Sequence, residues 1–286
     1  MIRVDLRALT QPVGILRMVE VVFTCISFSL VASVGSVSSS YWAWCMFTWC
    51  FCCFFTLLIL VLEFTTFNVK LPISWEDFTT AFAMLATLMM LAASIIYPSV
   101  VFSCPSCSRQ IAASTVSIIC VGVYVGEVVL LRMRPGLISG FLSSIPGLMK
   151  IMETFVACII FTCLDSGRYN HFPGLQWCVA VYSLCFIFAL LIILIIIGQL
   201  LAYFPLSFDK LVTVFNALAV LMYMTAAVIW PLYAFKSHPR PTDCTQGACL
   251  RWDGLVVVTF MTIINLIIYI MDTAYSIYLV FFIQHE

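Results

Sequence analysis

Six charged residues interrupt stretches that are otherwise apolar, three in each half of the chain: Arg17, Glu20 and Glu127, then Lys150, Glu153 and Asp272. In each half the base stands three positions before the first acid, so the two share one helix face. We expect the third residue, an acid on a later helix, to complete one polar cluster. Such a cluster could fix the register of two helices, relay protons or ions, or contact a partner protein. With two acids for each base, one carboxyl could keep its proton.

Two cysteine pairs are spaced closely enough to close small loops. Cys104 and Cys107 are separated by two residues, and Cys244 and Cys249 by four. Each pair comes just before the last apolar run of its half, on the side of the membrane expected to be oxidising, where both would form disulfides. The same spacing also occurs in redox and zinc sites, but no third cysteine accompanies either pair, which favours disulfides.

The elements that must position these residues are membrane-spanning helices. Of the 286 residues, 64% are hydrophobic and 9% are charged, whereas a soluble domain carries roughly 25% charge. Apolar runs long enough to cross a bilayer predict eight helices. We expect them at 15–37, 41–62, 79–102, 111–131, 147–164, 177–201, 211–233 and 254–280. The sequence therefore predicts an all-α integral membrane protein.

The chain repeats itself at a constant offset of 133 positions. The segment PISWEDFTTAFAMLATLMMLAASIIYP at 72–98 aligns without a gap with PLSFDKLVTVFNALAVLMYMTAAVIWP at 205–231, and 11 of the 27 positions are identical. Chance similarity between apolar helices is the alternative, but proline, serine, base and acid all keep the register. We predict two parallel four-helix bundles, 1–134 and 135–286, inserted the same way up because four is even.

The repeated segments also predict how two helices begin. Ser74 and Ser207 precede the third helix of each unit, where a hydroxyl can cap free backbone N–H groups. Asp77 and Asp209 lie in the first turn, at the positive end of the helix dipole. We expect helix initiation at the cytosolic surface; a docking point for a cytosolic protein is the alternative.

Two further patterns concern helix packing and lipid. Gly122 and Gly126 form a G-x-x-x-G motif, which allows close approach of another helix. Lys210, Phe215 and Leu218 match a short pattern proposed for cholesterol contact, which is a hypothesis-grade signal.

Orientation follows from the distribution of basic residues. With the N-terminus in the cytosol, eight of the 13 basic residues fall on the cytosolic side, so we expect both termini there. The formal net charge is zero, which provides no basic field for nucleic acid.

The four-helix unit resembles a MARVEL domain, through a first helix that opens with G-x-x-[RK]-x-x-E, short loops and a cysteine pair before the last helix. Two such units in one chain resemble the myeloid-associated differentiation marker family, on Gly14, Arg17 and Glu20 with their copies, and on PISWEDF and PLSFDKL. The resemblance implies a non-enzymatic organiser of cholesterol-rich ordered membrane (a membrane raft). It also implies links to the cortical cytoskeleton, cell spreading and adhesion, and a location in plasma, junction or vesicle membranes.

Three classes of function were compared. A scaffold agrees with short loops and with the lack of a phosphate loop, a metal motif or a serine–histidine constellation, so no cofactor is expected. Its candidate partners are membrane lipids including cholesterol, cytoskeletal or junction proteins, and a second copy of the chain. A transporter or channel using the intramembrane acids is the alternative, although its helices would usually be broken at mid-membrane. A membrane enzyme lacks a nucleophile and base.

Overall fold

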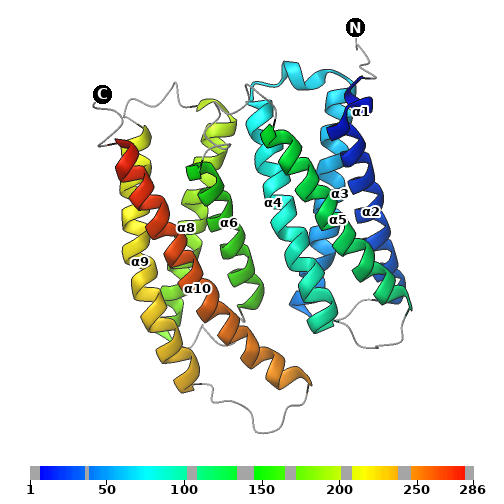
Figure 1. Cartoon of the computed structure of the whole chain (residues 1–286). Helices are drawn as coiled ribbons and strands as arrows, with labels where there is room; N and C mark the ends of the chain where they lie inside the picture. Colours follow the sequence, from blue (N-terminus) through cyan, green and yellow to red (C-terminus); the bar gives the residue numbers. More distant parts are fainter. Residues whose placement is uncertain are drawn as a thin grey trace. The chain divides into compact units, whose positions relative to one another are not determined.

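The computed structural model describes residues 7–35, 39–101, 108–133, 145–164, 172–200, 208–237 and 246–280. It divides into two compact units, residues 1–144 and 145–286. The expected boundary at 134/135 lies ten positions earlier, at the edge of a stretch outside the described residues. Each unit is a bundle of four long helices (Figure 1).

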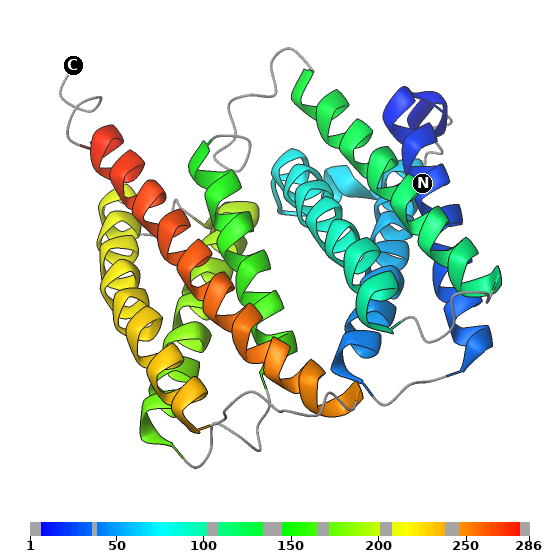
Figure 2. The same ribbon diagram turned by 60° about the horizontal axis from the view of Figure 1, so that its bottom comes forward.

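The first unit contains α2 (Pro12–Val34), α3 (Ser40–Phe64), α4 (Trp75–Ile96) and α5 (Ser108–Met133). The short helices α1 (Arg7–Thr10) and η1 (Phe67–Lys70) precede α2 and α4, and the π-helical turn η2 (Tyr97–Val101) extends α4. Contacts close a ring in which α2 packs on α3 and α5, and α4 also packs on both. Figure 2 shows these helices running side by side along the bundle.

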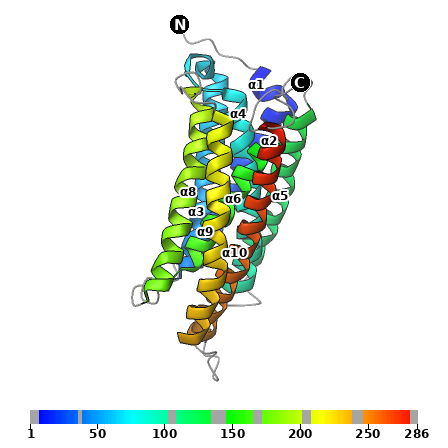
Figure 3. The same cartoon turned by 90° about the vertical axis from the view of Figure 1, so that its left-hand side faces the viewer.

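The second unit contains α6 (Ile145–Cys163), α8 (Pro173–Ile197), α9 (Phe208–Ser237) and α10 (Gln246–Tyr278). Its ring has the same order, because α6 packs on α8 and α10, and α9 packs on both. Figure 3 shows α9 beside α8 and α10. In each unit the first and last helices are therefore neighbours, as the shared polar residues required.

All eight long helices are long and apolar enough to cross a membrane. α2 and α8 start where the sequence supplies a proline in the first turn, Pro12 and Pro173, because the missing N–H is not needed there. Most helix ends lie within four positions of the expected ones. α10 begins at Gln246, eight positions before 254, and α9 runs to Ser237 through Pro231. Pro231 lies within two turns of that end, where losing one hydrogen bond is least disruptive.

Equivalent contacts hold the two interiors together. The Cys45 thiol faces the carbonyl of Ala93 at 4.0 Å, and 133 positions later the Cys178 thiol faces that of Ala226 at 3.9 Å. One further pair is conserved in position but not in type. The Trp49 indole donates to Ser117 Oγ at 3.0 Å, and its counterpart Tyr182 bonds the Thr262 hydroxyl at 2.8 Å. Equivalent positions therefore meet inside each of the two bundles.

Candidate functional site: a buried polar cluster in each unit

The first cluster is centred on Arg17 and gathers side chains from four helices. Arg17 lies on α2 and is 3% exposed. Its Nε donates to Glu127 on α5, and its Nη1 donates to both carboxylate oxygens of Glu63 on α3 at 2.7 Å. The indole of Trp75 on α4 donates to Glu63 Oε1 at 3.0 Å. One guanidinium therefore ties α2, α3 and α5 together, and α4 joins through Glu63.

Glu20 is the unsatisfied member of the first cluster. It is fully buried, one turn along α2 from Arg17, and neither of its oxygens accepts a hydrogen bond from the described residues. One base therefore faces three acids in this cluster, and Glu20 is the acid that it does not bond.

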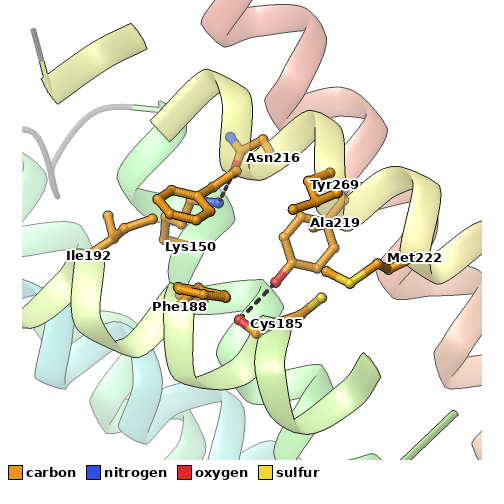
Figure 4. Close-up of a pocket in the computed structure, with 11 residues that line it drawn as sticks. Lys150, Cys185, Phe188, Ile192, Asn216, Ala219, Met222 and Tyr269 are labelled. Atoms are coloured by element: carbon orange, nitrogen blue, oxygen red, sulfur yellow. Dashed lines mark hydrogen bonds between the residues drawn. The ribbon is translucent and has the colours of Figure 1, made fainter. Parts of the chain in front are cut away.

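The second cluster is centred on Lys150, on α6. Its Nζ lies 2.7 Å from Glu153 Oε2 on the same helix and 2.7 Å from Asp272 Oδ2 on α10. It also donates to Asn216 Oδ1 on α9 at 2.6 Å (Figure 4). The Asn216 amide in turn donates to Asp272 Oδ2 at 2.8 Å. Lysine, two acids and amide thus form a closed network with every member at most 1% exposed.

The two clusters draw their third partner from different helices. In the first unit it is Glu63 on α3, whose position in the repeat is taken by Ile196 in the second. In the second unit it is Asn216 on α9, whose counterpart in the first is Ala83. In both units the cluster lies near the end where the first helix begins and the last helix ends. A buried base needs several acceptors, and each unit supplies them by its own route.

The six charged residues singled out in the sequence are thus brought together in two groups of three. Neither Glu63 nor Trp75 was predicted to join a cluster. Glu63 lies just past the expected end of a span at residue 62, and Trp75 lies before the expected start of the next span at residue 79. Two buried amides also bond between helices. Asn216 bonds the lysine, and Asn265 donates to the Tyr223 hydroxyl at 2.8 Å. The absence of Glu63 and Asn216 from the repeat was the signal that each unit closes its cluster differently.

Ser74 occupies the N-cap position of α4, but its side chain does not cap the helix, contrary to the prediction. No side-chain cap bond forms there, and the hydroxyl instead donates to Asp77 Oδ2 at 2.6 Å. The hydroxyl donates to an ionised carboxylate, which is a strong acceptor, and Asp77 keeps its favourable place in the first turn. Asp209 also lies in a first turn, that of α9, while Ser207 lies outside the described residues.

The glycine motif does not bring two backbones together within its own unit. A Cβ added at Gly126 would meet the Leu16 side chain at 3.6 Å, an ordinary contact, and one added at Gly122 would meet no described atom within 4 Å. Within the first unit, no described backbone atom closely approaches the motif, and contact with a helix outside this unit stays a prediction.

The loop cysteines lie mostly outside the described residues, which include only Cys249 of the four. Cys249 is disulfide-bonded, and the pairings Cys104–Cys107 and Cys244–Cys249 remain predictions. Apart from Cys163, nine other cysteines in the described helices are free thiols. No group of three or more metal-ligating side chains occurs among the described residues.

The comparisons with known proteins agree with this architecture. The model of the MARVEL family, described as a membrane-associating domain, matches residues 8–130 and 141–275. The chain is 44% identical over 290 residues to the myeloid-associated differentiation marker of Homo sapiens, covering 96% of this chain and 90% of that protein. No solved structure matches it.

Two further relatives show the same coverage. The myeloid-associated differentiation marker homolog of Xenopus laevis is 40% identical over 289 residues, which are 96% of this chain and 94% of that protein. The myeloid-associated differentiation marker-like protein 2 of Mus musculus is 42% identical over 285 residues, 95% and 92% respectively.

Fold and family model together define a multi-pass membrane protein built from two MARVEL domains, as the sequence predicted. The matched positions span both bundles and both polar clusters. On identity and coverage, the chain belongs to the myeloid-associated differentiation marker family.

Proposed function

We propose that this protein is a non-enzymatic organiser of cholesterol-rich ordered membrane, with both termini in the cytosol. Plasma and vesicle membranes are its proposed location, and the cortical cytoskeleton and cell junctions are its proposed attachments. The observation that carries the proposal is the partition of polarity in each bundle. Inside the spans Arg17 pairs with Glu63 and Glu127, Lys150 pairs with Glu153 and Asp272, and Glu20 is buried beside the first cluster, whereas the outer faces are apolar.

The outer faces support this reading. On α3 the exposed side chains in mid-helix are Phe47, Phe54 and Leu57, and on α8 they are Leu184, Ile187 and Leu191. Such surfaces interact with acyl chains and with other helices rather than with a soluble substrate. The relatives carry names that describe a cell marker and not an enzyme. A protein of this kind acts by binding lipids and other membrane proteins within the bilayer.

Proximity labelling in cells, with and without cholesterol depletion, tests the proposal. The full chain fused to a labelling enzyme should mark cortical or junction proteins, and this set should change when sterol is withdrawn. A labelled set that is indifferent to sterol would overturn the ordered-membrane part. Epitope tags at the two chain ends test orientation, because accessibility of either tag from outside intact cells contradicts cytosolic termini.

A transporter or channel is the competing function, favoured by one observation: Glu20 is a buried acid whose oxygens no described donor satisfies. Against it, both clusters lie near one end of their bundles instead of at mid-helix. The double variant Glu20→Gln with Glu153→Gln separates the two. Flux through reconstituted wild-type protein that this variant abolishes would establish transport and remove the organiser proposal.

A further inference from the structure

The short helix η1 lies across the end of the first unit at which α3 ends and α4 begins (Figure 1). None of its four residues is buried. Val69 is 82% exposed, the largest value among the large hydrophobic side chains that the structure describes, and Phe67 is 46% exposed. Both apolar side chains therefore face away from the bundle and meet whatever surrounds this end of it.

The lengths of the neighbouring helices place η1 at the depth of the lipid headgroups. α3 has 25 residues and α4 has 22, so α3 is about 37 Å long and α4 about 33 Å at the usual rise per residue. The hydrocarbon core of a bilayer is about 30 Å thick, and the headgroup layers bring it to about 40–45 Å. Each helix therefore crosses the core and ends inside a headgroup layer, and η1 begins three residues after the end of α3.

The connection that contains η1 is held at this depth at both of its ends. Thr66 adopts the left-handed conformation, with φ 51°, which ends α3 and turns the chain away from its axis. At the other end the Trp75 indole donates to Glu63 Oε1 at 3.0 Å, so the first residue of α4 is tied to the last turn of α3. η1 itself packs on α3. Residues 65–74 therefore run over the end of the bundle instead of extending into water.

The outward side chains of η1 combine apolar surface with one charge. Residues three apart lie one above the other in a 3-10 helix, and Lys70 Nζ lies 5.6 Å from the centroid of the Phe67 ring. A lysine in such a place keeps its stem on apolar surface and its ammonium at the polar level. Phe67 and Val69 are thus placed to enter the upper acyl layer, with Lys70 at the level of the lipid phosphates.

The charges around η1 indicate which lipid fits it. Besides Lys70, the charged side chains of this connection and of the first turn of α4 are Glu76 and Asp77. One base beside two acids provides no attraction to an anionic membrane, so insertion of the apolar side chains must carry the contact. The fitting partner is a zwitterionic phospholipid, whose phosphate accepts from Lys70. The repeat places Tyr203 at the position of Lys70, so the second unit has no base there.

We propose that η1 is an interfacial anchor of the first unit. It lies in the headgroup layer with Phe67 and Val69 inserted among zwitterionic phospholipids and with Lys70 against a phosphate. The inference goes beyond the proposed function, because the anchor requires neither sterol nor a partner protein. Its depth favours lipid over a soluble protein as the cover of Phe67 and Val69, and a docked protein is one outcome of the test.

Depth-dependent fluorescence quenching tests the anchor. The full chain, with Val69 replaced by a fluorescent amino acid, would be reconstituted in sterol-free phosphatidylcholine vesicles. A nitroxide on the acyl chain near the headgroup should quench this probe at least threefold more than a nitroxide near the chain end. Aqueous iodide should quench it at least threefold less than it quenches the free fluorophore. The same probe in place of Phe54, 59% exposed near the middle of α3, is the matched control and should show the reverse order of the two nitroxides.

Two variants of the probe-bearing chain test the role of the charge. Lys70→Glu places a carboxylate at the level of the phosphates and should reduce quenching by the shallow nitroxide at least twofold. Lys70→Arg keeps the charge and should leave this quenching unchanged. Lys70 is exposed, so neither change disturbs the interior of the bundle. Equal quenching in the two variants would overturn the assigned phosphate contact.

The remaining outcomes decide between lipid, water and protein. A probe at 69 that iodide quenches fully and neither nitroxide quenches overturns the anchor, because η1 then faces water. A photo-crosslinking amino acid at 69 should give phospholipid adducts in cells, and adducts to a protein would overturn the anchor in favour of a docked partner. Because the vesicles contain no sterol, shallow quenching there together with a sterol-indifferent set of neighbours in cells would refute the organiser and leave the anchor standing.

Discussion

At the scale of single residues, the decisive feature is a base buried among more acids than it can neutralise. Removing a buried charge from water is costly, and only good geometry with full hydrogen bonding compensates for it. Lys150 achieves this with three partners within 2.7 Å. Arg17 does so through Glu63 and Glu127, which leaves Glu20 buried without a described donor.

The acids of the first cluster should therefore differ in their effect on stability. Glu127→Ala removes a direct partner of Arg17 and should lower the free energy of unfolding by about 3–5 kcal/mol. Glu20→Gln should leave it unchanged or raise it, because the new amide can donate to the neighbouring carboxyl. Unfolding of the purified protein in micelles measures both. Glu76→Gln, an exposed acid in the first turn of α4, is the control. Equal damage from Glu20→Gln and Glu127→Ala would contradict this account.

The Asn216 amide of the second cluster should contribute to stability through its hydrogen bonds to Lys150 and Asp272. Asn216→Ala removes an acceptor from Lys150 and a donor from Asp272, so we expect a loss of about 1–3 kcal/mol for the buried groups left unpaired. Thr213→Val on the same helix should be nearly silent, since Thr213 is half-buried and its described hydrogen bond is to its own helix. The comparison is made by thermal unfolding. A silent Asn216→Ala would show that the amide is not needed to close the network.

At the scale of helices, each bundle is held by polar contacts placed at mid-helix as well as at the cluster. The Tyr182–Thr262 bond joins α8 to α10 across the second unit, and the Trp49–Ser117 bond joins α3 to α5 across the first. Both bonds are buried. Hydrogen bonds between membrane helices contribute modestly, about 0.6 kcal/mol on average, so they fix which helices are opposite each other more than they provide stability.

A double-mutant cycle should reveal the hydrogen bond between Tyr182 and Thr262. Tyr182→Phe and Thr262→Val each remove one partner, and we expect each to cost about 0.5–1.5 kcal/mol. The double variant should cost less than the sum of the two, because the second change removes a bond already lost. Thermal unfolding of the four proteins provides the cycle. Strict additivity would mean that the two hydroxyls do not interact.

How far the sequence predicts such features depends on their type. The lengths of the apolar runs predict the eight helices. The repeat predicts that they form two bundles of four. Both can be recognised directly from the sequence. The charged triads follow as well, since an acid inside the membrane must face a partner. Glu63, Trp75 and Asn216 could not be assigned, because each joins its cluster from a different helix and the rotation of that helix is set by the packing of the whole bundle. The Ser74 side chain forms no cap bond and instead donates to Asp77, a local contact that residue type and spacing alone did not specify.

At the scale of the whole molecule, the chain is two compact units of similar size, each with its own hydrophobic core. Each core is closed by its own ring of helices and its own polar cluster. Two such units should respond to mutation independently, whatever their arrangement in the bilayer.

Combining Ser117→Ala in the first unit with Tyr182→Phe in the second tests this independence. We expect the losses in stability to add within about 0.5 kcal/mol, as they do for sites without shared partners. Hydrogen exchange followed peptide by peptide provides the second readout: Ser117→Ala should raise exchange in 108–133 and leave 173–197 unchanged. Raised exchange in both ranges would show that the units unfold as one.

The different origins of the third partner, Glu63 on α3 and Asn216 on α9, bear on the history of the gene. A crossover that replaced α3 by α8 would leave Arg17 without Glu63 and without any asparagine in exchange. The reciprocal product would crowd an additional carboxylate around Lys150. An exchange of single helices between the two units should therefore destabilise both products, so each unit depends on its own set of helices.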